Sequence, residues 1–273
     1  MSTIQYTWKQ LNHDSSAPPL ARSSHEVSCI GENLFLLGGE HIARTPIDSD
    51  VYVLKLTAQL QCWRKIECLP GCTKPPSARI AHAQAVIGRS LWVFGGREGV
   101  DMGEGPLNDL HCFDTTTNQW SGAILPKVSD LSDASTTNIP PPPRSFHKMV
   151  SVDHKLYVFG GCGVVGRLAD LHVFDTLEST WTALPLSDKI AGRGGSCFAA
   201  VQVRGEPCLL VTMGYSGQEN NDVHIFNINT NQWTEVVASE RESCSERVAC
   251  VLISQLRHRP PGTVPSCSCS AGR

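Results

Sequence analysis

The sequence contains no apolar run long enough to cross a membrane. No stretch approaches the roughly 18 consecutive apolar residues of a transmembrane helix, and Met1–Gln10 lacks the apolar core of a secretory signal. Charged residues are sparse at 18%, with a net charge of −3, so neither nucleic acid nor a membrane surface is an expected partner. These absences predict a cytoplasmic protein, with the nucleus as a second location.

The sequence also lacks the motifs of common enzyme sites. It has no Gly-x-Ser-x-Gly nucleophile elbow and no phosphate-binding loop. The glycine cluster Gly192-Arg193-Gly194-Gly195 falls inside a repeat described below, so it is not interpreted as a nucleotide loop. No catalytic residue is predicted, and a non-enzymatic role is favoured.

Cysteine, in contrast, is abundant, with twelve residues. Cys62, Cys68 and Cys72 cluster, but no second pair follows at the spacing of a zinc site. Five others lie in apolar runs and are expected to be small buried hydrophobic residues: Cys29, Cys112, Cys197, Cys208 and Cys250. Without a signal peptide, reduced thiols are favoured over disulfides.

The main feature that is present is a repeat of four units. Each unit begins with an arginine, at Arg22, Arg79, Arg144 and Arg193. A histidine follows three residues later in the first three units, and a Gly-Gly pair ends an apolar run 16 residues after the arginine. An aspartate and then a tryptophan complete each unit, at Asp50 and Trp63, Asp109 and Trp120, Asp170 and Trp181, and Asp222 and Trp233.

Each unit contains apolar runs of four to six residues that are rich in Val, Phe, Tyr and Leu, such as 34–37, 91–94, 156–159 and 209–212. Runs this short predict strands, because helices need ten or more periodic positions. Four strands in about 50–60 residues are typical of one β-propeller blade. We expect the glycine-linked strands to lie next to one another near the propeller axis, and each tryptophan to pack between blades.

The Gly-Gly pair after an apolar strand, with a tryptophan about 20–24 residues further on, resembles the kelch repeat from Trp8 to about Ile253. Three segments are also similar to the plant kelch proteins related to nitrile-specifier, epithiospecifier and thiocyanate-forming proteins: Phe94-Gly95-Gly96-Arg97, Phe159-Gly160-Gly161-Cys162-Gly163 and Gly192–Gly195. The resemblance implies an all-β, kelch-type β-propeller.

The expected propeller is incomplete. One domain, 1–256, contains an N-terminal strand at 4–9, blades at 22–67, 79–121, 144–183 and 193–235, and a partial fifth unit at 246–253. Residues 257–273 are rich in Pro, Ser and Cys and are predicted to be a disordered tail. Four blades and a fragment predict a truncated or alternatively spliced chain whose ring is open or imperfectly closed.

The repeat separates framework positions from variable ones. The recurrent Arg22, Arg79 and Arg144 either bond carbonyl groups between blades or form a guanidinium ring for an anionic ligand. His25, His82 and His147 also recur, which favours a structural role over metal binding. The residues after the glycine pair differ between units and start the variable loops, so they are the candidate ligand or partner surface: Glu40, Arg97, Cys162 and Tyr215.

By resemblance, the specifier branch holds iron with Glu, Asp and His, and the matching loop here offers Glu219, Asp222 and His224. Their spacing is contracted, and the Asp and His recur in other units, so a metal site is not favoured and no cofactor is expected.

The leading hypothesis is a kelch propeller that binds an unidentified protein or small ligand through its loop face. The alternative is a specifier-like protein that uses Fe²⁺, with Arg97 meeting the sulfate of a glucosinolate breakdown product released by a myrosinase-type glucosidase. An iron-dependent lyase-like activity would follow from that alternative alone.

Overall fold

The computed structural model describes residues 18–56, 62–67, 73–99, 105–124 and 138–237. The expected N-terminal strand at 4–9, the partial fifth unit at 246–253 and the tail at 257–273 lie outside the described residues. The described part is all β, and it contains no helix long and apolar enough to cross a membrane.

Four antiparallel sheets of four strands each follow one another along the chain, one for each repeat. In every sheet the strands are arranged in chain order, and in the first a short hairpin, β3 (Glu40–Ile42) and β4 (Thr45–Pro46), is inserted before the third strand. The sheets are blade 1, with β1 (Glu26–Ile30), β2 (Asn33–Leu37), β5 (Val51–Lys55) and β6 (Trp63–Ile66); blade 2, with β7 (Ala83–Ile87), β8 (Ser90–Arg97), β9 (Pro106–Asp114) and β10 (Gln119–Ala123); blade 3, with β11 (Lys148–Val152), β12 (Lys155–Cys162), β13 (Arg167–Asp175) and β14 (Thr180–Ala183); and blade 4, with β15 (Cys197–Val203), β16 (Glu206–Thr212), β17 (Val223–Asn227) and β18 (Gln232–Glu235). The predicted strands and the four-blade division are present.

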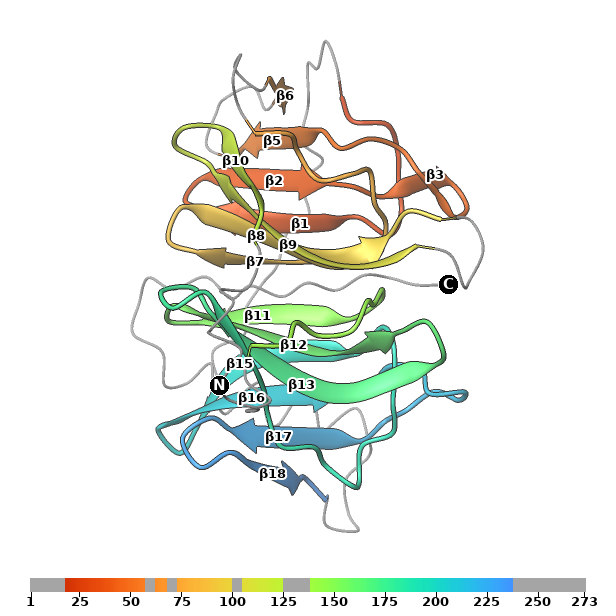
Figure 1. Cartoon of the computed structure of the whole chain (residues 1–273), viewed down its shortest axis with the longest axis vertical. Helices are drawn as coiled ribbons and strands as arrows, with labels where there is room; N and C mark the ends of the chain where they lie inside the picture. The colour runs from red at the N-terminus through yellow and green to blue at the C-terminus, as the bar shows by residue number, and fades with distance from the viewer. Residues whose placement is uncertain (1–17, 57–61, 68–72, 100–104, 125–137, 238–273) are drawn as a thin grey trace, which may run out of the picture.

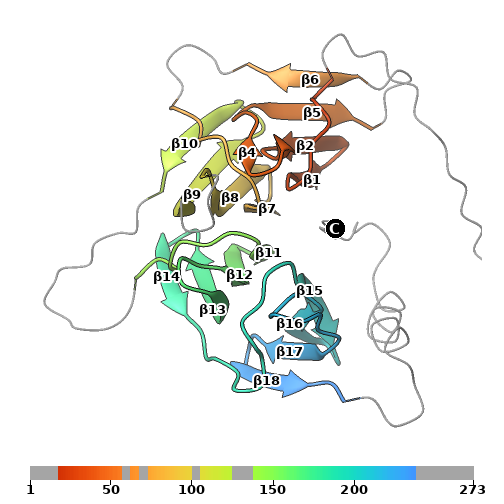
Figure 2. The same cartoon turned by 90° about the vertical axis from the view of Figure 1, so that its right-hand side faces the viewer.

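The blades stand side by side in an open arc rather than a closed ring (Figure 1, Figure 2). The first strands of successive blades contact one another, β1 with β7, β7 with β11 and β11 with β15, and they form the inner side of the arc. The glycine-linked strands β2, β8, β12 and β16 were expected to lie next to one another near the axis, but the first strands make these contacts between blades. The glycine-linked strands are second from the axis.

The glycine pairs are required by the next blade, not by crowding at the axis. A Cβ on Gly38 would lie 2.5 Å from the backbone oxygen of Arg79, and a Cβ on Gly95 would lie 2.9 Å from that of Arg144. Both glycines have a positive φ, where a side chain adds strain. This close approach allows a backbone hydrogen bond across each seam: Gly39 N–H to Arg79 O at 3.0 Å, Gly96 N–H to Arg144 O at 2.9 Å, and Gly161 N–H to Arg193 O at 2.8 Å.

The core consists of three apolar clusters, one in each seam between blades. Trp181, 2% exposed, lies between blades 2 and 3 and contacts the Phe94 ring at a centroid distance of 5.1 Å. Trp120, 3% exposed, fills the seam between blades 1 and 2. These positions agree with the prediction that the tryptophans pack between blades, because a single-layer sheet has to bury its faces against its neighbours.

One buried ion pair joins blades that are not adjacent. Lys148 Nζ on β11 lies 2.9 Å from Glu26 Oε1 on β1, and both side chains are less than 10% exposed. Burial raises the pKa of Glu26, although the charge of Lys148 opposes this shift. At the equivalent position β7 has the small Ala83, which leaves space for the two side chains to meet.

The cysteine prediction is partly wrong. Cys208 is buried, but Cys29 is exposed, and Cys112 and Cys197 are half-buried. Ser28 on β1 hydrogen-bonds Gln84 of blade 2, so the alternation of side chains directs Cys29 away from blade 2. No disulfide links the cysteines of the described residues.

The seam packing gives a stability prediction. Trp181→Ala should lower the free energy of unfolding by about 3–5 kcal/mol, because the blades on either side cannot collapse into the cavity. Trp233→Ala, at the equivalent but half-buried position of blade 4, should cost roughly half as much or less. Urea denaturation of the two variants measures the difference, and equal losses would contradict the packing account.

Candidate functional site

Each repeat arginine is buried and paired with an aspartate of its own blade. The side chains of Arg22, Arg79, Arg144 and Arg193 are at most 2% exposed. Each guanidinium also donates to a backbone carbonyl at the first position of the glycine pair or its equivalent in its own blade, which is Gly38, Gly95, Gly160 or Met213. The shortest N–O distances in the four pairs are Arg22–Asp48 at 3.0 Å, Arg79–Asp109 at 2.8 Å, Arg144–Asp170 at 2.7 Å and Arg193–Asp222 at 2.5 Å. Each guanidinium therefore connects strands within one blade. The backbone oxygens of Arg79, Arg144 and Arg193 accept hydrogen bonds from the preceding blade and so link neighbouring blades.

The pairs favour the charged form of each aspartate. Burial alone would raise the pKa of Asp109, but hydrogen bonds from Arg79 and His111 hold it well below its usual range. Burial would likewise raise the pKa of Asp170, but hydrogen bonds from His172 and Arg144 lower it well below its usual range. These carboxylates are thus already occupied by partners of the chain itself.

The first unit departs from this pattern. Arg22 binds Asp48 rather than Asp50, which aligns with the paired aspartates of the other units and instead lies 2.6 Å from Lys65. Tyr52 stands two residues after Asp50, where the other units have His111, His172 and His224. The Arg22 guanidinium lies 5.1 Å from the centre of the Tyr52 ring.

Buried neutral histidines accompany the arginines. Burial, with the nearby charge of Arg79, lowers the pKa of His82 to about 3. Burial and Arg144 likewise lower the pKa of His147, whose Nε2 lies 3.1 Å from the Phe94 oxygen in blade 2. These positions are structural ones within the seams.

The four residues after the glycine pairs differ in exposure. Glu40 is half-buried and accepts a hydrogen bond of 2.5 Å from Ser24, and Arg97 is only 3% exposed. Cys162 is half-buried, and burial raises the pKa of its thiol, although the charges of Arg167 and Arg97 oppose this. Tyr215 is 46% exposed, with the Arg167 guanidinium 4.8 Å from its ring centre.

The loops at this end of the blades, here called the loop face, also carry exposed apolar side chains that the sequence interpretation missed. Phe146 and Met213 have φ values of 56° and 60°, a conformation unfavourable for bulky residues. Comparing the repeats could have revealed both, because Phe146 aligns with Ser24, Ala81 and Gly195, and Met213 aligns with the first glycines of the other units. The exposed apolar residues of the loop face are Ile42, Phe146, Val164, Val165, Met213 and Tyr215.

The side chains of two of the three candidate iron ligands, Asp222 and His224, already have partners. Both carboxylate oxygens of Asp222 accept hydrogen bonds from Arg193, at 2.5 and 2.7 Å. His224 Nε2 lies 3.0 Å from Asp222, and Glu219 forms a backbone bridge with Tyr215. Within the described ranges no group of three or more His, Cys, Asp or Glu side chains could hold a metal ion. The donor set in this arrangement does not fit iron.

The open arc of four-stranded blades, each braced by an arginine–aspartate pair, defines a kelch-type β-propeller. A family model for the KLHDC2/KLHL20/DRC7 kelch-repeats domain matches residues 1–130 and 127–257. The chain belongs to the kelch-repeat family.

Among individual relatives, the chain is 28% identical over 263 residues to an N-(sulfonatooxy)prop-2-enimidothioate sulfolyase of Thlaspi arvense, covering 90% of this chain and 70% of the relative. It is 26% identical to an acyl-CoA-binding domain-containing protein 5 of Arabidopsis thaliana, covering 77% of this chain and 30% of that protein. The chain is 29% identical to an Adagio-like protein 1 of Oryza sativa subsp. japonica, covering 66% of this chain and 26% of that protein. The chain thus spans less than a third of the latter two relatives.

The buried histidines predict acid sensitivity. His82 stays neutral in the folded state down to pH about 3, whereas the unfolded chain gains a proton near pH 6.5. Its contribution to stability is therefore complete above pH 6.5 and is lost as the pH falls, by about 1.4 kcal/mol per pH unit. Urea denaturation between pH 7 and 5 should show that the free energy of unfolding changes less steeply with pH in His82→Gln than in the original chain. A His41→Gln control, at an exposed residue, should retain the slope of the original chain.

Proposed function

We propose that this chain is a binding module that recruits a protein partner or a small ligand through its loop face. The observation that carries the proposal is the contrast between an invariant framework and a variable, exposed surface. Every blade contains a buried arginine paired with an aspartate, whereas the loops beside it present Phe146, Val165, Met213 and Tyr215 to solvent. Membership of the kelch-repeat family supports a binding role, while fold alone does not select the partner.

Two features of the loop face favour recognition over simple solvation. Exposed apolar side chains gathered on one face are typical of interaction sites. Strained backbone at bulky residues such as Phe146 and Met213 is frequent where a protein holds a ligand. Among the four variable positions, Tyr215 is the most accessible, Glu40 and Cys162 are half-buried, and Arg97 is buried.

A double variant tests this proposal. Val165→Asp with Tyr215→Ala removes two exposed apolar contacts without touching an arginine–aspartate pair, so the fold should persist. We expect the amount of partner that the immobilised chain retains to fall by about tenfold or more, the usual effect of losing anchor residues. Leu177→Asp is the matched control, because Leu177 is 70% exposed in the turn at the opposite end of blade 3. The loop face would be refuted as the binding surface if the double variant retained as much partner as the original chain, or if the control lost as much as the double variant.

A second candidate function is suggested by the sulfolyase relative, which covers 90% of this chain. In that case Arg97 would meet an anionic sulfate, and Glu219, Asp222 and His224 would supply ligands to Fe²⁺. The present geometry favours the binding module, because Asp222 is bound by Arg193 and by His224.

Anaerobic titration with Fe²⁺ separates the two candidates. We expect no stoichiometric binding, since iron would have to displace the charged guanidinium from Asp222. Glu219→Gln should then leave the titration unchanged. One iron per chain, lost on Glu219→Gln while the melting temperature is retained, would instead favour the specifier-like function.

A further inference from the structure

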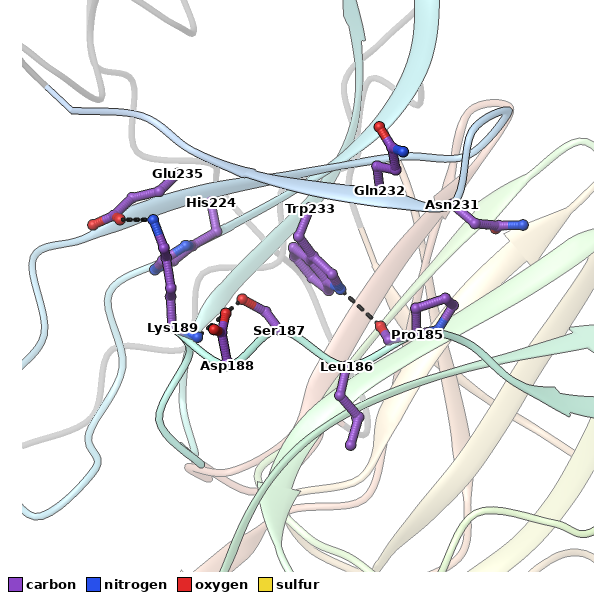
Figure 3. Close-up of a pocket in the computed structure, with 10 residues that line it drawn as sticks. All are labelled: Pro185, Leu186, Ser187, Asp188, Lys189, His224, Asn231, Gln232, Trp233 and Glu235. Atoms are coloured by element: carbon purple, nitrogen blue, oxygen red, sulfur yellow. Dashed lines mark hydrogen bonds and ion pairs between the residues drawn. The ribbon is translucent and has the colours of Figure 1, made fainter.

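A cavity of about 360 Å³ lies on the flank of blade 4 (Figure 3), and its lining includes none of the exposed apolar residues of the loop face. It is bounded on one side by the segment Pro185–Lys189, which connects blade 3 to blade 4, and on the other by β17 and β18. This volume is at the lower end of the range of small-molecule sites, about 300–1,000 Å³. The cavity therefore suits a small ligand rather than a peptide.

An aromatic side chain forms part of the cavity wall. The Trp233 ring extends from β18 toward the connecting segment, and its Nε1–H donates to the Pro185 oxygen at 2.8 Å (Figure 3). This bond fixes the ring and uses its only donor, so the ring offers a ligand its apolar surface. Trp233 is half-buried, whereas Trp120 and Trp181 are 3% and 2% exposed at the equivalent positions.

The rest of the lining is mostly polar and carries both donors and acceptors. Asp188 and Glu235 contribute carboxylates and Lys189 an ammonium group, whereas the amide side chains of Asn231 and Gln232 point away from the Trp233 ring (Figure 3). Lys189 Nζ lies 3.4 Å from Glu235, with side chains 63% and 36% exposed, so a ligand can reach both partners. A surface pair of this kind is weak and readily accepts a competing hydrogen bond.

The seam between blades 1 and 2 provides an internal comparison. A smaller cavity of about 260 Å³ lies there and is lined by Trp120, Lys65 and Asp50. In that cavity Lys65 is held by Asp50 at 2.6 Å, and the tryptophan is almost fully covered. The accessible indole is therefore a feature of the blade 4 cavity rather than of every seam.

We propose that the cavity beside Trp233 binds a neutral carbohydrate ring. A pyranose has an apolar face of C–H groups that can stack on an indole, and its hydroxyl groups both donate and accept hydrogen bonds. The carboxylates of Asp188 and Glu235 accept from such hydroxyls, and Lys189 donates to them. Two carboxylates at the rim disfavour an anionic aromatic ligand of the same size. The site uses neither Val165 nor Tyr215, so it is separate from the proposed loop-face function.

Nuclear magnetic resonance of the indole N–H groups in the full chain tests the proposal. The probes are the methyl glycosides of glucose, galactose and mannose, and the Trp233 signal is identified by its absence in Trp233→Phe. At least one glycoside should shift this signal saturably, with a Kd on the order of 1 mM. Asp188→Asn and Lys189→Ala should each weaken binding by about fivefold, the effect of losing one hydrogen bond, with an unchanged melting temperature. Lys65→Ala, in the comparison cavity, should have no effect.

Three results would overturn the carbohydrate site. In the first, none of the glycosides shifts the Trp233 signal. In the second, the shift persists at full affinity in Asp188→Asn and Lys189→Ala, or Lys65→Ala weakens it equally. In the third, sodium benzoate titrated in parallel shifts the signal at lower concentrations than any glycoside, which would assign the cavity to planar anions.

Discussion

The rest of the structure depends on the buried arginine of each repeat. Its guanidinium is bound by an aspartate and a carbonyl oxygen of the same blade, and in blades 2 to 4 its own backbone oxygen accepts a hydrogen bond from the preceding blade. A buried charge is tolerated only when its hydrogen bonds are complete, so the aspartate and the carbonyl have to stay in place. One residue thereby fixes the strands within a blade and the distance between blades. The variable loops begin directly beside this fixed point, which gives them a rigid base.

The same contact explains the glycine pairs. The backbone of the next arginine lies so close that a Cβ on Gly38 would be 2.5 Å from it, which excludes every side chain at that position. Met213 occupies the equivalent place in blade 4 and is 47% exposed, so it adds an apolar side chain to the loop face.

The loop face and the Trp233 cavity illustrate two ways in which a repeated scaffold acquires binding surfaces. On the loop face, side chains change where the framework does not constrain them, as at Phe146 and Tyr215. On the flank of blade 4, the framework residue Trp233 is retained, and the connecting segment around Asp188 leaves it accessible. On the loop face, changed residues create the surface. At Trp233, the local path of the chain creates it.

The sequence alone determined the repeat, the strands and the four blades, because strand periodicity and the recurrence of Arg, Gly-Gly, Asp and Trp are local properties. It also identified Asp170 as a framework residue, but it left Arg144 open between a structural role and an anion-binding role and did not pair the two. Only the tertiary structure decided that Asp48 replaces Asp50 beside Arg22, that the first strand of each blade is innermost, and that Asp222 is occupied by Arg193. The physical reason is that pairing, exposure and cavity shape depend on how neighbouring segments approach in space. Trp120 and Trp233 occupy the same place in the repeat, yet the first is 3% exposed and the second is half-buried, because different segments cover them.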